Sequence, residues 1–203
     1  MKTLLCVCLL LTLSSAVWAQ TFKGTQVGND TDNTSPDLKA FTERTRQQVK
    51  ALQEAINMIS SPKTPVEDKQ MAIEQTLGMF MKGSTIQVSG VKNPKRVNAY
   101  SLNEYLQNLS LLGKRYKVVE MRVYKPAKIA DFVKNPDGTW SGNATYFQDF
   151  SAITTAGATL HDRVAKRIET WLKKEKDAFT NQEDWMLVLG NISVVEVNEV
   201  PVN

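Results

Sequence analysis

The first half of the chain carries apolar residues at the spacing of helix faces. Between residues 37 and 113, apolar side chains recur three and four positions apart, which places them on one side of an α-helix. Prolines and glycines divide this pattern into three stretches, residues 37–60, 66–83 and 101–113. We therefore predict three helices, with a short alternating strand at residues 84–89 between the second and the third.

The predicted helices begin at residues that favour a helix N-terminus. Ser35 is a suitable N-cap for the first helix. Thr64 with Glu67, and Ser101 with Glu104, have the capping-box spacing ahead of the second and third helices. Apolar residues surround more of the second helix than of the first, so we expect the second helix to be the more buried of the two.

From Lys117 onward the pattern changes from a helical period to alternation. The runs at residues 117–132, 139–154 and 185–200 predict three long strands. Residues 160–172 are ambiguous, because their apolar positions recur every four residues and satisfy both a helix and a strand. Short connections to strands on either side favour a strand here, which makes four long antiparallel strands in all.

The strand at residues 139–154 is the most legible element, since the turn Asn-Pro-Asp-Gly at residues 135–138 precedes it. Its positions alternate between two faces, one with Trp140, Tyr146, Gln148 and Phe150, the other with Asn143, Thr145, Phe147 and Asp149. Both faces hold aromatic residues, so the sequence does not decide which face turns towards the helices. The basic stretch at residues 90–98, which contains Asn-Pro, is expected to form a loop.

The N-terminus has the pattern of an export signal. Lys2 precedes an apolar run at residues 4–13, and Val17-Trp-Ala19 supplies a small-x-small cleavage site. Both cysteines, Cys6 and Cys8, fall inside this segment, so the exported chain holds no disulfide. These features predict a periplasmic or secreted protein.

The predicted organisation follows from these elements. Residues 1–19 are the signal peptide, and residues 20–36, which are rich in Thr, Asn, Gly and Asp, are a flexible leader. Residues 37–203 are one α+β domain, in which an N-terminal helix precedes a cone-like core at residues 64–200. No segment after the signal is apolar enough to predict a membrane span.

The charge and the chemistry of the side chains exclude several partners. The formal net charge is only +4, and the basic clusters lack interleaved aromatic residues, so we expect no nucleic-acid partner. His161 is the single histidine, and no paired carboxylates have metal-ligand spacing. We therefore predict neither a metal site nor a cofactor.

The order of elements resembles the nuclear transport factor 2-like superfamily, also described as SnoaL-like or cystatin-like. Three stretches carry the resemblance: Leu77-Gly-Met-Phe80 before Thr85-Ile-Gln-Val88, the hairpin Asp137-Gly-Thr-Trp-Ser-Gly142 leading to Phe147-Gln-Asp-Phe150, and the closing run from Trp185 to Val194. The chain is most similar to exported bacterial members. The resemblance implies an α+β cone in which helices pack on a curved antiparallel sheet, with one additional N-terminal helix.

The resemblance also implies a pocket between the helices and the concave face of the sheet. We predict that its ligand-contacting residues include Tyr124, Trp140, Tyr146, Gln148 and Phe150. An enzyme of the isomerase or cyclase type would need an acid–base group there, for which the candidates are His161, Asp162, Tyr124, Tyr146 and Asp149. His161 is expected at the surface and Asp162 in a surface ion pair, so no residue is assigned a catalytic role.

Three functional hypotheses follow. The preferred one is an exported, non-catalytic protein that binds a small ligand or a protein of the cell envelope. An alternative is a small isomerase or dehydratase that uses an acid–base residue in the cone. A second alternative is a structural or adaptor protein with a filled core, and a homodimer through the sheet suits this superfamily.

Overall fold

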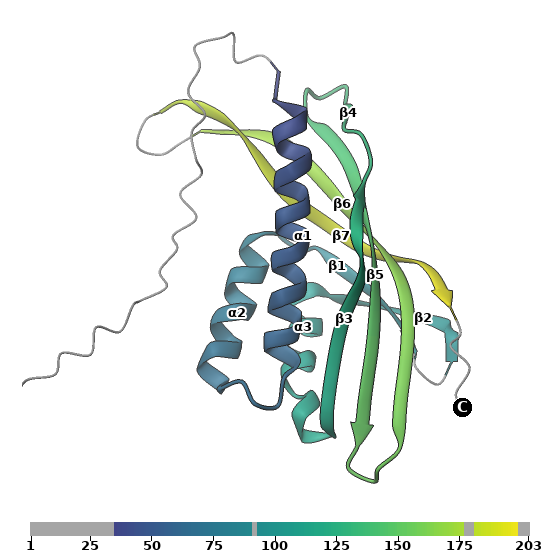
Figure 1. Ribbon diagram of the computed structural model, residues 1–203. Coiled ribbons are helices and arrows are strands. Elements are labelled where there is room, and N and C mark those ends of the chain that lie inside the picture. The colour runs from purple at the N-terminus through teal and green to yellow at the C-terminus, as the bar shows by residue number, and fades with distance from the viewer. Residues whose placement is uncertain (1–34, 91–92, 177–180, 199–203) are drawn as a thin grey trace, which may run out of the picture. The chain divides into compact units, whose positions relative to one another are not determined.

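The computed structural model describes residues 35–90, 93–176 and 181–198 (Figure 1). The helices are α1 (Leu38–Ser60), α2 (Val66–Gly78), α3 (Leu102–Ser110) and a 3-10 turn, η1 (Leu112–Lys114). The strands are β1 (Thr85–Gly90), β2 (Asn93–Ser101), β3 (Tyr116–Ile129), β4 (Val133–Lys134), β5 (Trp140–Thr154), β6 (Thr159–Lys176) and β7 (Glu183–Asn198).

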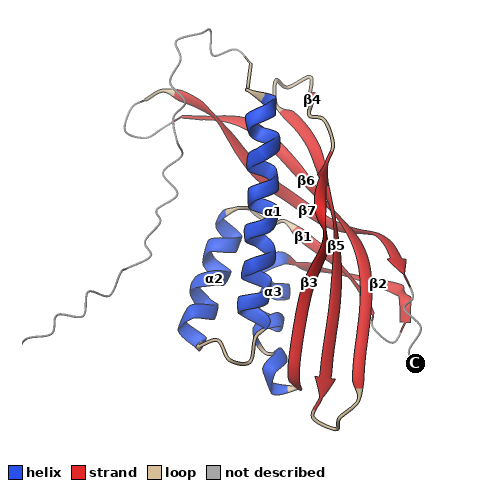
Figure 2. Cartoon of the chain, viewed as in Figure 1, coloured by secondary structure: helices blue, strands red, loops and turns tan. Residues whose placement is uncertain are grey.

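The strands form one mixed sheet in the order β2-β1-β7-β6-β5-β3, with β4 pairing to β5 beside this path. Strands β1 and β7 run parallel, and the other neighbours run antiparallel. The three α-helices lie on one face of the curved sheet (Figure 2). The predicted architecture of helices on a curved sheet is therefore confirmed. None of the described helices has the length and apolar character needed to cross a membrane.

Helix α1 supplies much of the buried surface between the two layers. Its stripe of inward-facing residues comprises Phe41, Thr45, Val49, Leu52, Ile56 and Ile59. The helix begins after Asp37, whose Oδ1 accepts hydrogen bonds from the backbone N–H groups of Lys39 and Ala40, each at 3.1 Å. The prediction of Ser35 as N-cap is wrong, because this carboxylate reaches the free amides of the first turn instead.

Helix α2 is shorter than predicted, because its last residues pair with the sheet. It ends at Gly78 rather than at Gly83, and the backbone then runs beside β7. The N–H of Leu189 donates to the carbonyl of Met79 at 2.9 Å, and the N–H of Met81 donates to the carbonyl of Leu189 at 2.8 Å. These bonds to a strand over a hundred residues away override the helical pattern of the sequence.

Two further predictions about α2 are wrong. Pro65 stands at its N-cap position without a side-chain hydrogen bond, so Thr64 and Glu67 form no capping box. Its apolar residues point in several directions, and Val66 and Met71 remain 76% and 58% exposed. Since only one side of α2 meets the rest of the protein, α1 is the more buried helix.

Strand β2 replaces most of the loop predicted at residues 90–98. It pairs antiparallel with β1 from Thr85–Ser101 to Gly90–Asn93 and forms one edge of the sheet. Edge strands do not need an apolar sequence, and charged residues and proline are common there. The basic composition of residues 90–98 therefore led to the wrong prediction of a loop.

Residues 160–172 form part of β6, which confirms the choice of a strand over a helix. The register with β5 places Gln148 opposite Val164 and Ala144 opposite Ile168, all of them buried. The even-numbered positions of both strands therefore face the helices, which answers the question that alternation alone left open. On the outer face, Arg163 Nε lies 2.6 Å from Asp149 Oδ1. A homodimer through this outer face stays a prediction.

We predict that the burial order of the two helices appears in their response to the same mutation. Val49→Ala, at a position of α1 that is 1% exposed, should lower the free energy of unfolding by about 2 kcal/mol. Val66→Ala, at the exposed start of α2, should change it by less than about 0.5 kcal/mol. Urea unfolding of both variants measures these differences, and equal losses would contradict the difference in burial between Val49 and Val66.

Candidate functional site

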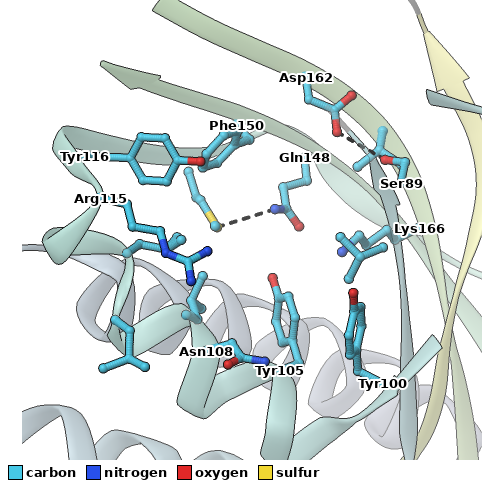
Figure 3. A pocket seen from close by; sticks show the side chains of 16 residues that line it. Ser89, Tyr100, Tyr105, Asn108, Arg115, Tyr116, Gln148, Phe150, Asp162 and Lys166 are labelled. Atoms are coloured by element: carbon cyan, nitrogen blue, oxygen red, sulfur yellow. Dashed lines mark hydrogen bonds between the residues drawn. The ribbon is translucent and has the colours of Figure 1, made fainter. Parts of the chain in front are cut away.

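A cavity of about 460 Å³ opens between α3, η1 and the inner face of the sheet (Figure 3). Most of its wall is apolar, with contributions from Val88, Leu109, Leu111, Leu112, Met121, Phe150 and Val164. Its polar and charged lining residues are Ser89, Tyr100, Tyr105, Asn108, Arg115, Tyr116, Gln148, Asp162 and Lys166. Pockets for small molecules have this composition, an apolar wall with a few converging polar groups.

The helical wall is positioned by the N-terminus of α3. Ser101 Oγ accepts a hydrogen bond from the N–H of Glu104 at 3.1 Å, as predicted for this helix start. Leu102, Leu106 and Leu109 then face the core, and they fix the rotation of the helix. This rotation directs Tyr105 towards the sheet, so that its ring forms part of the cavity wall (Figure 3).

The sheet wall is set by the pairing of β5 with β6. Phe150 lies opposite Asp162, Gln148 opposite Val164, and Tyr146 opposite Lys166. All of these residues except Tyr146 line the cavity. Tyr146 is fully buried behind it.

The structure brings two of the five predicted pocket residues, Gln148 and Phe150, to the cavity. Tyr146 shares their face of β5 but is not among the lining residues. Trp140 packs at a second, smaller core with Phe41, Phe132, Leu172 and Leu187. The side chain of Tyr124 is outside the part of the chain that the structure describes.

Lys166 is the most unusual residue of the cavity. It is 2% exposed, and its Nζ lies 5.5 Å from the centre of the Tyr105 ring. Among the described residues, no carboxylate oxygen lies within salt-bridge distance of Nζ. Burial lowers the pKa of Lys166 to about 8, and the negative charge of Asp162 opposes part of this shift. A buried ammonium without a close counter-ion is energetically costly.

Two tyrosines neighbour Lys166: its Nζ faces the ring of Tyr105, and Tyr146 is its partner across the β5–β6 pair. Burial raises the pKa of Tyr105 to about 12. Burial, and secondarily the proximity of Tyr105, raise the pKa of Tyr146 further above its ordinary value. Both hydroxyls therefore stay protonated at neutral pH and can donate hydrogen bonds. The Tyr146 hydroxyl has no hydrogen-bond partner among the residues that the structure describes.

Gln148 presents an amide to the centre of the cavity (Figure 3). The residue is 6% exposed, and its Nε2 donates to the sulfur of Met121 at 3.4 Å. Sulfur is a weak acceptor, and the Gln148 Oε1 atom has no partner in the described part of the chain. The buried amide therefore has hydrogen-bonding capacity that its contact with Met121 does not use.

Asp162 lies at the end of the cavity next to β1. Its Oδ2 accepts a hydrogen bond from Ser89 Oγ at 3.1 Å, which joins β6 to β1. The prediction of a surface ion pair for Asp162 is wrong, because the even-numbered positions of β6 face inward. His161 is exposed, as predicted.

Sequence reasoning missed Lys166, Tyr105 and Arg115. Lys166 does leave a signal, since it is a charged residue between the apolar inward positions Val164 and Ile168 of the predicted strand. Tyr105 also stands in the apolar stripe of the predicted third helix. Arg115 follows that helix in a basic segment and has no such signal. In the described ranges, no three His, Cys, Asp or Glu side chains cluster closely enough to hold a metal ion.

Solved structures with a similar chain path share little sequence with this protein. A nuclear transport factor 2-like superfamily protein from Salmonella enterica serovar Typhimurium is 12% identical, with 81% of this chain and 96% of that chain covered and a TM-score of 0.46. A putative aromatic ring hydroxylase from Novosphingobium aromaticivorans is 8% identical, with coverages of 81% and 94% and a TM-score of 0.47. Aln2 from a Streptomyces species is 11% identical, with coverages of 78% and 91% and a TM-score of 0.40.

No protein-family model and no curated protein sequence matches the chain. The arrangement of three helices on one curved, mixed sheet agrees with the α+β architecture that the resemblance implied.

We predict that Lys166→Met stabilises the folded chain, and more at neutral than at alkaline pH. The folded chain releases the Lys166 proton near pH 8, whereas the unfolded chain keeps it up to the ordinary pKa of 10.5. The unfolded state therefore binds more protons between these values, and the stability of the parent protein rises with pH. The cost of the buried charge, on the order of 3 kcal/mol, is present below pH 8 and fades as pH approaches 10.5.

Urea unfolding of the parent and of Lys166→Met at several pH values measures this effect. Lys173→Met is a matched control, because Lys173 is partly exposed and pairs with Glu175. Its difference from the parent should not follow the same pH profile. A stability difference for Lys166→Met that is constant across this pH range would contradict the lowered pKa.

Proposed function

We propose that this chain is an exported protein that binds a small, largely apolar ligand in the cavity between α3 and the sheet, without catalysing its conversion. The observation that carries the proposal is the cavity itself. Its volume of about 460 Å³ falls within the usual range for small-molecule sites, and its wall is mainly apolar. This volume favours ligand binding over the alternative of a filled structural core.

The acid–base candidates named from the sequence support binding rather than an isomerase reaction. His161 is exposed and is not among the lining residues. Asp162 is already engaged by Ser89, and the pKa of Tyr105 is raised by burial, so its hydroxyl keeps its proton. An isomerase of the kind considered from the sequence needs a base positioned over its substrate.

The same proposal includes export by the segment at residues 1–19. This segment is outside the described residues, so export rests on the basic, apolar and small-residue pattern of the sequence. A ligand-binding protein without cysteines after residue 19 suits an oxidising compartment, since it depends on no thiol chemistry there.

Occupancy of the cavity predicts that the protein retains a ligand when purified from its own host. Native mass spectrometry should show an added mass on the parent protein, and extraction with organic solvent should release it. Leu112→Trp, which places a large ring at the cavity wall, should lower the bound fraction at least about tenfold, because the ring occupies ligand volume.

Met71→Trp is the matched control, since Met71 is 58% exposed on α2 and is not a lining residue. It should retain the ligand. Circular dichroism and thermal unfolding confirm that both variants are folded. A parent protein that carries no ligand, and that binds an apolar fluorescent probe no better than Leu112→Trp does, would contradict the proposal.

Export predicts that the mature protein begins at Gln20. Intact mass and N-terminal sequencing of the periplasmic and medium fractions of a bacterial host should show cleavage after Ala19. Leu9→Arg, which interrupts the apolar run, should leave a full-length chain in the cytoplasm. A parent chain that keeps its first residues and stays in the cytoplasm would refute this part of the proposal.

A further inference from the structure

We propose that the cavity selects an apolar ligand that carries one carboxylate, and that the ammonium of Lys166 holds the carboxylate while the ligand's apolar body lies against Leu112, Tyr116 and Phe150. This inference rests on the proposed binding function and names its ligand class. It is carried by the geometry of the cavity and by the charges on its wall.

The first step concerns the net charge of the wall. Among the lining residues, Lys166 and Arg115 are cationic and Asp162 is anionic. Asp162 is hydrogen-bonded to Ser89 and is not ion-paired with Lys166. The wall therefore has an excess of one positive charge, and this charge lies in a largely apolar environment where electrostatic attraction is weakly screened.

The second step concerns the position of that charge. Lys166 is almost fully buried, and Figure 3 shows its Nζ directed into the cavity across from Arg115. An ammonium offers three donors, and the contact with the ring of Tyr105 satisfies none of them as a hydrogen bond. A carboxylate from the ligand would supply the missing counter-charge and acceptors, which offsets the cost of burying the ammonium.

The third step concerns the groups that surround the carboxylate. Gln148 is buried and lines the cavity, and its Nε2, which donates to the weakly accepting sulfur of Met121, carries a second N–H that a carboxylate could accept. The hydroxyl of Tyr105 keeps its proton at neutral pH and points towards the same space (Figure 3). Together these groups resemble the few fixed polar contacts that orient a ligand in an otherwise apolar pocket.

The fourth step concerns the ligand's body. Tyr116 and Phe150 meet edge to face, with their ring centres 6.4 Å apart, on the side of the cavity away from Lys166 (Figure 3). Leu112 is a further apolar residue of the lining. A ligand whose alkyl or aryl group lies here removes that group from water while the ligand's carboxylate reaches Lys166. One molecule therefore contacts both the apolar end and the cationic end of the cavity.

Matched carboxylate and amide ligands test this assignment by isothermal titration calorimetry. Decanoate and decanamide form one pair, and 1-naphthaleneacetate and 1-naphthaleneacetamide form the other. The parent protein should bind each carboxylate at least about tenfold tighter than its amide at pH 7, because only the carboxylate pairs with the ammonium. Decylamine should bind more weakly than either decanoate or decanamide.

Lys166→Met should abolish the preference for the carboxylate and retain binding of the amides. Lys69→Met is the matched control: Lys69 is also buried, but its Nζ donates to the carbonyl of Ser110 at 3.1 Å and it does not line the cavity. It should keep the full preference. Lys166→Arg, which retains the charge, should keep part of it.

The preference should also weaken as pH rises above about 8, where Lys166 loses its proton. The other titratable or charged groups that face Lys166 are Asp162, Tyr100, Tyr105, Tyr116, Tyr146 and Arg115. Burial moves the pKa values of Tyr105 and Tyr146 upward, away from this pH range. The pH arm uses the parent protein alone, so it remains decisive if a Lys166 variant does not fold.

The outcomes separate this inference from the proposed function. Equal affinities for carboxylate and amide would overturn the ligand class and leave the binding function standing. Tighter binding of decylamine would instead assign the cavity to cations held at Asp162. A full carboxylate preference in Lys166→Met would overturn the role of Lys166, and failure of every probe to bind would count against the binding function itself.

Discussion

The pairing of β5 with β6 is the constraint on which the rest of the structure depends. The two strands stay in one register from Trp140–Leu172 to Ile153–Thr159. Side chains alternate along a strand, so a slip of one residue would turn the whole buried set to the outer face. In this register the side chains of Ile168 and Tyr146 point towards the helices. Gln148 and Lys166 lie on the same face of the two strands and line the cavity. The core and the candidate site are therefore fixed by one set of hydrogen bonds.

The inward face of β6 serves both the core and the cavity, and these two uses favour different residues. A strand that buries one face would gain from an apolar residue at every inward position, yet Lys166 occupies one of them. The structure accommodates the ammonium by leaving open space beside it rather than by placing a carboxylate within salt-bridge distance, as far as the described residues go. Such a local departure from the best packing is common where a protein binds something.

The fold could be predicted where an element carries its own signal, as the Ser101 cap of α3 did, or where its neighbours decide between two patterns, as they did for the strand at residues 160–172. Prediction failed where distant contacts decided the outcome. The end of α2 depends on hydrogen bonds between Met79, Met81 and Leu189, and β2 is an edge strand with a basic sequence. Of the site, Gln148 and Phe150 followed from alternation, whereas Arg115 depends on how the segment after α3 turns towards the sheet.

The parallel pairing of β1 with β7 has a consequence for the order in which the chain can fold. Thr85 Oγ1 bonds Asn191 Oδ1 across 106 residues, and Ile86 aligns with Ile192. The hairpin of β1 and β2 therefore forms early along the chain but cannot join the sheet until the last strand exists. Until β7 is made, β1 lacks one of its two strand neighbours. Contacts between segments far apart in the sequence slow folding. They also lengthen the time during which exposed apolar surface and unpaired strand edges can aggregate.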